Sequence, residues 1–316
     1  RHVMTSNRRI SALVVASLLL PALAVADGVP TATPVPVFEL EGLSLPSDVA
    51  VGKGGQIYVV DGGNHQVAVF NASGQRITSL GMMGSDEGQF LNPVGIDTAP
   101  DGDVFVADKG NKRLVVFDAD GDYRRGVTLS ADDEDVVPVD IAVDRRGQTV
   151  FVTDNAAHRV AVFDVRGRFL HAFGEEGDGD GQFRYPATID IDAAGNVYVV
   201  DVLNARVQKF SADGAHLLTI GKLGGKAGTF YRPKGVVVTS DGRILVSDSF
   251  LGVGHVFDAA GEFLYMLGDS GTATVFETPV GLAAPGTMLF VTQMLAGKVA
   301  VFERLVPPAA TTEGGE

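Results

Sequence analysis

The sequence contains no cysteine. This excludes disulfides, thiolate metal sites, covalently attached haem and a cysteine nucleophile, so the chain folds by packing alone. It is also poor in positive charge, with 25 Lys and Arg against 39 Asp and Glu and a formal net charge of −14. Binding nucleic acid requires a basic face that displaces counterions from phosphates, so nucleic acid is not an expected partner.

Long apolar runs are also absent, apart from one near the amino terminus. Arg8 and Arg9 precede an apolar stretch over residues 10–23, and Ala24, Val25 and Ala26 follow it with the small residues of a cleavage site. This pattern predicts a signal peptide over 1–26, removed after Ala26, and a periplasmic or extracellular protein with no membrane span after removal. A retained amino-terminal anchor is the alternative. A linker is expected over 27–34 and a disordered tail over 306–316.

Internal repetition dominates the rest of the chain. Prolines recur every 45 to 48 residues, an apolar triplet ending in an acid recurs in the same register, and a phenylalanine follows each triplet nine residues later. The prolines are Pro46, Pro93, Pro138, Pro186, Pro233 and Pro279. The acids are Asp61, Asp108, Asp154, Asp201 and Asp248, with Gln293 in the sixth copy. The three series agree on six copies, which start near these prolines.

Each copy contains four short runs rich in Val, Ile, Phe and Tyr, separated by Gly, Asp and Asn turns, which predicts four antiparallel strands. One such sheet cannot bury both faces alone, so six must stack, and a closed ring does this with few exposed edges. We therefore predict an all-β, six-bladed β-propeller over 35–305. The last copy lacks its fourth strand, and we expect Val35 to Leu40 to supply it by pairing with residues around 298–302.

The repeated motifs resemble those of the NHL-repeat family. Pro-x-Gly-Ile, then an apolar triplet with Asp, then Asn-x-Arg-Val-x-x-Phe and Gly-x-Gly-x-Phe are legible over about 38–303, most closely in the copies at 93–121 and 186–233. The resemblance implies a six-bladed propeller. It implies no single function, because propellers of this type serve as binding platforms, sensors and, less often, lyases or hydrolases.

The most regular polar feature is an acid with a base five residues later. It occurs as Asp108 with Arg113, Asp154 with Arg159, and Asp201 with Arg206. Because the pair repeats in successive copies, we interpret it as structural, although a ring of acid and base groups is the functional alternative.

Residues just after each proline begin the innermost strand and are expected to line the channel. Asp48, Asp140 and Thr188 hold the second position after the proline, and Lys234 holds the first. These four are candidates for binding a cation or an ionised ligand; solvated rim charge is the alternative. If the channel binds a metal, Asp48 and Asp140 are the expected ligands and calcium the expected ion, although no cofactor is predicted outright.

Other candidate chemistry is sparse. The resemblance to the peptide-amidating lyase implies histidine-bound zinc, but the histidines here fall in different copies or outer strands, so such a site is not expected. Phe250 and Leu251, with His255 nearby, belong to an apolar insertion in the fifth copy that is a candidate contact loop; packing over a neighbouring blade is the alternative. No nucleophile triad or phosphate-binding loop is present.

Two functional hypotheses follow. The first is a non-catalytic binding or scaffold propeller that holds a protein, peptide or glycan partner in the cell envelope or outside the cell. The second is a divalent-metal-dependent lyase or lactone hydrolase with its site at the channel, as the resemblance to amidating lyases and gluconolactonase-like propellers implies. The sequence leans toward the first, because no catalytic constellation accompanies the fold signal.

Overall fold

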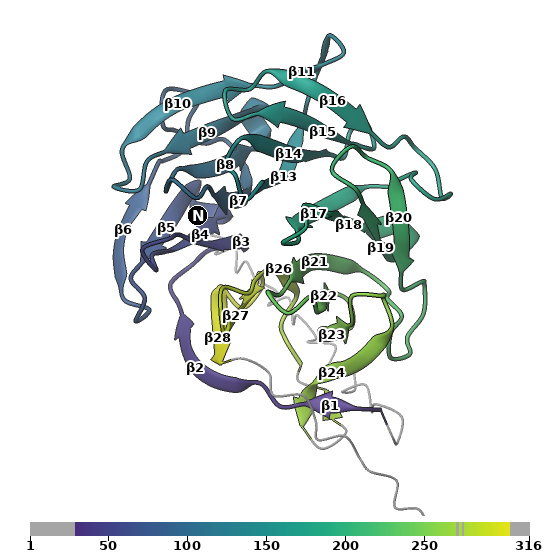
Figure 1. The fold of residues 1–316 in the computed structure, drawn as a ribbon. Coiled ribbons are helices and arrows are strands. Elements are labelled where there is room, and N and C mark those ends of the chain that lie inside the picture. The colour runs from purple at the N-terminus through teal and green to yellow at the C-terminus, as the bar shows by residue number, and fades with distance from the viewer. Residues whose placement is uncertain (1–28, 270–271, 274, 304–316) are drawn as a thin grey trace, which may run out of the picture.

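The computed structural model describes residues 29–269, 272–273 and 275–303. The expected signal peptide and the tail lie outside these residues. Six four-stranded antiparallel sheets surround a central channel (Figure 1). Each blade begins with its innermost strand and adds strands outward, so the sequence prediction of an all-β six-bladed propeller is confirmed.

The blades have the following strands. Blade 1 comprises β3 (Pro46–Val51), β4 (Ile57–Asp61), β5 (Gln66–Phe70) and β6 (Arg76–Leu80). Blade 2 comprises β7 (Pro93–Thr98), β8 (Val104–Asp108), β9 (Arg113–Phe117) and β10 (Tyr123–Thr128). Blade 3 comprises β13 (Pro138–Val143), β14 (Thr149–Asp154), β15 (Arg159–Asp164) and β16 (Phe169–Phe173).

The second half continues the pattern. Blade 4 comprises β17 (Pro186–Ile191), β18 (Val197–Asp201), β19 (Arg206–Phe210) and β20 (His216–Ile220). Blade 5 comprises β21 (Pro233–Val238), β22 (Ile244–Asp248), β23 (Val253–Phe257) and β24 (Phe263–Asp269). Blade 6 comprises β26 (Pro279–Ala283), β27 (Met288–Gln293), β28 (Lys298–Glu303) and β2 (Val35–Leu40).

The remaining elements are short. They are β1 (Thr31–Ala32), β11 (Ser130–Ala131), β12 (Glu134–Asp135), β25 (Thr272–Ala273) and the 3-10 turns η1 (Gly62–Asn64), η2 (Lys109–Asn111) and η3 (Val202–Asn204). No helix within the described ranges is long and apolar enough to cross a membrane.

Both ends of the described chain close the ring. β2 pairs antiparallel with β28, with Leu40 opposite Val299, so blade 6 contains strands from both ends, as the sequence predicts. β1 lies within the stretch expected to be a linker and pairs parallel with β24, with Thr31 opposite Met266. The amino-terminal segment therefore pairs with strands of blades 5 and 6, the last two blades along the chain, where the ring closes.

The core consists of apolar layers between neighbouring blades. One such layer joins Phe105 and Val116 of blade 2 to Val152 and Phe163 of blade 3, all of which are buried. The central strands of each blade are buried on both faces. Because neither face meets water, their sequences are continuous runs of Val, Ile and Phe and do not alternate with polar residues. This packing fixes the six inner strands around the channel.

The two ends of the channel differ in the turns that surround them. In every blade the first proline pairs with the last residue of the second strand, as Pro46 does with Asp61. The start of each inner strand therefore lies beside the turn between the second and third strands, and we call this end of the propeller the proline end. The inner strands finish at the opposite end, which we call the cavity end.

Candidate functional site

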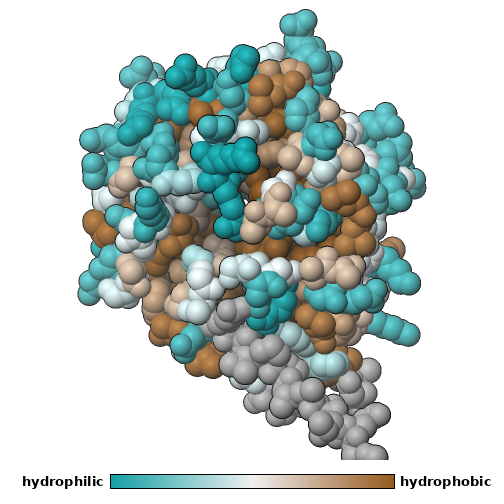
Figure 2. Space-filling model, viewed as in Figure 1, coloured by the Kyte–Doolittle hydropathy of each residue, from teal (hydrophilic) through white to brown (hydrophobic). Residues whose placement is uncertain are grey.

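The inner strands of all six blades line a cavity of about 200 Å³ in the channel. The lining residues come from the later part of each inner strand and from the turns that follow, such as Arg145 and Pro285, so the cavity lies toward the cavity end. Figure 2 shows a hollow at the centre of the ring with hydrophilic side chains along part of its edge. A site here would be reached along the channel.

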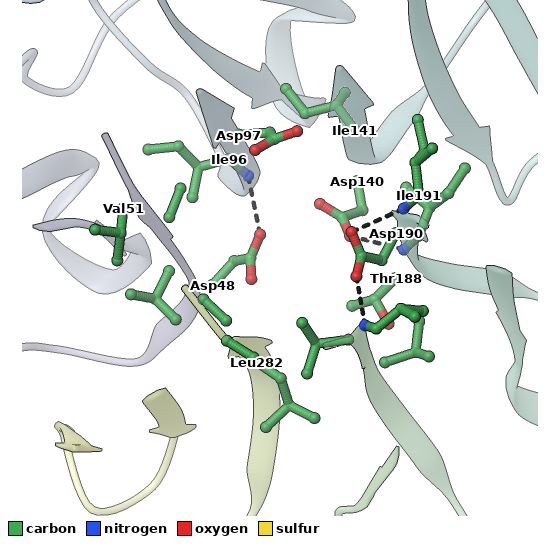
Figure 3. A pocket seen from close by; sticks show the side chains of 18 of the residues that line it. Asp48, Val51, Ile96, Asp97, Asp140, Ile141, Thr188, Asp190, Ile191 and Leu282 are labelled. Carbon is green, nitrogen blue, oxygen red and sulfur yellow. Dashed lines mark hydrogen bonds between the residues drawn. The ribbon is translucent and has the colours of Figure 1, made fainter. Parts of the chain in front are cut away.

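Four aspartates from blades 1 to 4 line this cavity, and we call them the acidic channel (Figure 3). Asp48 and Asp140 are two residues after the proline of their blades, whereas Asp97 and Asp190 are four residues after it. Residues two apart in a strand lie on the same face, so alternate blades present a carboxylate at two levels. Sequence inspection of the second position alone finds Asp48 and Asp140 but misses the other pair.

Each of these carboxylates accepts a hydrogen bond from the backbone of the next blade. The donors are Ile96 N to Asp48 (3.0 Å), Val143 N to Asp97 (2.7 Å), Ile189 N to Asp140 (2.9 Å) and Val238 N to Asp190 (2.6 Å). An inner strand has no neighbour on its channel side, so these N–H groups lack a partner within their own sheet. The carboxylates satisfy them and join blades 1 to 5 in series.

Neighbouring glycines leave room for two of the acids. A Cβ at Gly95 would overlap the carboxylate oxygen of Asp140, and a Cβ at Gly281 would overlap that of Asp48. Both glycines hold the same repeat position as the aspartates, one blade away. A Cβ at either glycine would also come within 3 Å of backbone atoms of the adjacent inner strand, so the close approach of the two strands requires glycine here as well.

Burial makes these acids hard to ionise. Asp48 and Asp140 are 7% and 4% exposed, whereas Asp97 and Asp190 are half-buried and face the channel. Desolvation raises the pKa of Asp48, Asp97 and Asp190 to about 7. It also raises the pKa of Asp140, and the charge of Asp48 raises it further. At neutral pH the channel therefore holds protons as well as negative charge.

The acidic channel does not offer a complete metal site. The described part of the chain contains no group of three His, Asp or Glu side chains placed to hold an ion. Asp140 Oδ1 is buried and has no hydrogen-bond partner among the described residues, so it could accept a proton or ligate an ion. Calcium usually takes six to eight oxygen ligands, so an ion held by the predicted ligands Asp48 and Asp140 would need further oxygens from the backbone or from water.

The structure separates the four sequence-predicted channel residues into two groups. Asp48, Asp140 and Thr188 line the cavity. Lys234 is not among its lining residues; it lies at the start of β21, at the proline end, with its Nζ 5.9 Å from the centre of the Tyr185 ring. Thr188 Oγ1 donates to the Lys234 carbonyl at 2.5 Å, so the two groups are linked through the backbone.

A second cavity of about 410 Å³ lies between blades 3 and 4. It shares Arg145 and Ile191 with the channel cavity, and His171, Arg146 and Asp192 also line it. The guanidinium of Arg145 opposes the rise in the pKa of Asp190. The two cavities therefore adjoin at Arg145 and Ile191, at the cavity end.

The predicted contact loop is only partly as expected. Phe250 is 53% exposed, and Leu251 is half-buried against Val253 and Met266. His255, however, lies in β23 and is 1% exposed, with its Nδ1 accepting a hydrogen bond from Gly228 N at 3.3 Å. Including His255 in a surface loop was wrong, because the strand face that bears it packs against Phe230 and its neighbours.

The repeated acid and base pairs connect the blades. Arg113 Nε lies 3.2 Å from Asp108, Arg159 Nε 3.5 Å from Asp154, and Arg206 Nε 2.9 Å from Asp201. Arg206 also donates to the carbonyls of Gly179 and Gln182 in the preceding connection. Where the pattern breaks, other hydrogen bonds form: Gln66 donates to Asp61 in blade 1, and Gln293 accepts from Glu277 N in blade 6. These contacts support the structural interpretation.

The comparison with protein families agrees with this geometry. The profile of the NHL repeat matches residues 43–70 and 90–117, and a profile described as a 6-bladed beta-propeller matches residues 141–226. The chain is an NHL-repeat, six-bladed β-propeller. None of the curated proteins matches this NHL-repeat propeller in sequence.

Solved structures share the fold of the NHL-repeat propeller at low identity. It is similar to a catalytically inactive virginiamycin B lyase from Staphylococcus aureus with quinupristin (12% identity, 82% of this chain, 80% of that chain, TM-score 0.60). It is also similar to a streptogramin B lyase (13%, 84% and 86%, TM-score 0.60) and to a protein of unknown function from Bacteroides thetaiotaomicron (14%, 87% and 74%, TM-score 0.65). At such identities the likeness shows the fold alone.

Proposed function

We propose that this propeller is a non-catalytic binding protein that holds a protein, peptide or glycan partner in the cell envelope or outside the cell. One observation carries the proposal. The second strand of each blade ends in an aspartate, or in Gln293 in blade 6. Two residues after it, in the turn to the third strand, blades 4, 5 and 6 have Leu203, Phe250 and Leu295, which are exposed by 69%, 53% and 66%. Large exposed apolar side chains gathered at one end of a protein mark interaction surfaces.

The asymmetry of this position strengthens the argument. Blades 1, 2 and 3 carry Gly63, Gly110 and Ala156 there, so at this turn position large apolar side chains occur only in blades 4, 5 and 6. A purely structural residue would recur across the blades, as the aspartate at the end of the second strand does in blades 1 to 5. The half ring of Leu203, Phe250 and Leu295, which we call the apolar arc, therefore supports a specific contact.

The test compares partner capture by the wild-type propeller with capture by a triple variant, Leu203→Ser, Phe250→Ser and Leu295→Ser. A matched control, Ile77→Ser with Leu217→Ser, removes apolar side chains exposed to a similar degree on outer strands. We expect the arc variant to lose a partner that the control retains. Equal capture by both variants, with both folded, would refute the role of the arc.

A second candidate is an enzyme of the lyase or lactone hydrolase class at the acidic channel. The observation that favours it is the buried pair of Asp48 and Asp140, because a carboxylic acid with a raised pKa suits general acid catalysis. Two of the similar solved structures are named as lyases, which supports the same class. The chemistry that this pair supports is the donation of a proton from one of its carboxyl groups to a leaving group or carbonyl oxygen of the substrate.

Elemental analysis separates the two candidates. The protein is purified without metal affinity and compared with the double variant Asp48→Asn with Asp140→Asn, alongside a screen of lactone and ester substrates. One equivalent of calcium or zinc lost in the double variant, together with lost turnover, would favour the enzyme. A metal-free protein without turnover would favour the binding propeller.

A further inference from the structure

Three basic side chains gather at the proline end of the channel, and we call them the basic mouth. Lys234 is the second residue of β21, Arg232 directly precedes that strand, and Lys109 begins η2 in blade 2. Within the described part of the chain, the side chains of Lys109, Arg232 and Lys234 form no ion pair. A cluster of uncompensated cations is notable in a chain that carries 39 acids and 25 bases.

The charges of the basic mouth act on one another. Lys234 is largely buried, and its burial together with the positive charges of Arg232 and Lys109 lowers the pKa of its ammonium. Its Nζ lies over the face of Tyr185, 5.9 Å from the ring centre, which offsets part of this cost. An anion bound at the mouth would offset the repulsion and raise the pKa of Lys234.

A buried donor stands at the corresponding turn of blade 3. Asn155 is the first residue after the blade acid, the position that Lys109 holds in blade 2. It is 7% exposed, and its Nδ2 has no hydrogen-bond partner among the described residues. A buried amide donor without an acceptor is unfavourable, so this turn also favours a ligand that carries acceptor oxygens.

An apolar surface borders the basic mouth. Tyr185, Tyr231 and Phe250 are exposed by 39%, 49% and 53%, and with Leu203 we call them the aromatic shelf. The rings of Tyr231 and Phe250 lie 5.4 Å apart, and the Tyr185 carbonyl accepts from Val202 N beside Leu203. Because Tyr185 also contacts Lys234, the shelf and the mouth form one surface.

We propose that this surface binds an acidic peptide segment of a partner protein, with carboxylates at the basic mouth and apolar side chains on the aromatic shelf. The inference rests on the proposed binding function and specifies the chemistry of the partner. A short acidic segment fits better than a long polyanion, because the net charge of −14 repels extended negative charge. Apolar side chains are required because the shelf offers mainly carbon surface.

The test uses a fluorescent hexapeptide that alternates glutamate with phenylalanine, and a second hexapeptide in which glutamine replaces glutamate. Binding to the whole protein is measured by fluorescence anisotropy at low and at high salt. We expect the glutamate peptide to bind about tenfold more tightly than the glutamine peptide, and this preference to shrink as salt screens the charges. The variant Lys109→Ala with Lys234→Gln should abolish the preference.

Two further variants separate charge from packing. Phe250→Ser should weaken both peptides alike, because it removes shelf surface without changing charge. Lys222→Ala, which removes an exposed cation from the connection before blade 5, should leave both affinities unchanged. Circular dichroism at matched temperature confirms that each variant is folded, and Lys234→Gln keeps a long polar side chain in the largely buried position of Lys234.

Several outcomes would overturn the inference. Equal affinity for the two peptides, an unchanged preference in the mouth variant, or tighter binding of an oligogalacturonate of equal charge would each reject the acidic peptide. The last result would assign the mouth to an acidic glycan. If the peptides fail but the apolar arc variant still loses its partner, the binding function stands and only the partner chemistry is wrong. If neither effect is seen, both proposals fail.

Discussion

Replacing Asp48 with asparagine should make the propeller less sensitive to pH. The asparagine Oδ1 can still accept the hydrogen bond from Ile96 N, so the variant removes a charge while keeping the contact between blades 1 and 2. Burial raises the pKa of Asp48 from 3.8 to about 7. Between these values the native state keeps a proton that the unfolded chain releases, so the free energy of unfolding falls as pH rises through this window.

The magnitude follows from the two pKa values. For one independent carboxyl, a native pKa of about 7 and an unfolded pKa of 3.8 correspond to a loss of about 2 kcal/mol between pH 5.5 and pH 8.5. Asp48 interacts with Asp140, and water in the channel screens both, so we expect a measured difference of about 1–2 kcal/mol. The variant should therefore gain stability over the wild type as pH rises, and most of that gain should appear by pH 8.

Urea unfolding followed by far-ultraviolet circular dichroism suits this test, because the chain contains no tryptophan. The control is Asp178→Asn, which removes an exposed acid from the connection before blade 4. A wild-type protein whose stability does not fall from pH 5.5 to pH 8.5, or an Asp48→Asn variant with the same pH dependence as the wild type, would refute the argument. So would a variant that is less stable at both pH values.

Other predictions concern the blade contacts and the leader. Arg206→Ala should cost about 3–5 kcal/mol in urea unfolding, because it leaves the buried carboxylate of Asp201 without its partner; a loss below about 1 kcal/mol would contradict this. Burial lowers the pKa of His255 to about 4, so His255 alone contributes a loss of about 1.5 kcal/mol between pH 6.5 and pH 5, opposite in sign to the change from the channel aspartates; the free energy of unfolding of the wild type relative to His255→Gln, which can still accept from Gly228, should therefore fall by about 1.5 kcal/mol over this range. On export, the intact mass should correspond to a chain that begins at Asp27; an unprocessed mass would indicate a retained anchor.

The repeat explains why the fold could be predicted so fully. Each proline begins an inner strand and lies opposite the last residue of the second strand, so the register of all six blades is visible in the spacing of Pro46 and its equivalents. The missing strand of the last copy and the unassigned Val35–Leu40 segment together indicate how the ring closes. In a closed ring, every local element has a fixed neighbour.

The candidate site was less predictable. Asp97 and Asp190 were missed because their role depends on which N–H groups of the next blade face the channel, and such partners lie about 46–48 residues away. His255 was misplaced because the local sequence does not show which face of β23 packs inward. Lys234 was grouped with the acids, but strand direction places it at the other end of the channel.

The sequence by itself determined the number of blades, the order of strands, the closure of the ring and the acid and base pairs, because these depend on periodic local patterns. Only the tertiary structure decided which residues meet across blades. It assembled the acidic channel from four blades, separated the basic mouth from it, and exposed Leu203 and Phe250 while burying His255. These outcomes depend on the rotation from one blade to the next, which brings together residues from separate copies.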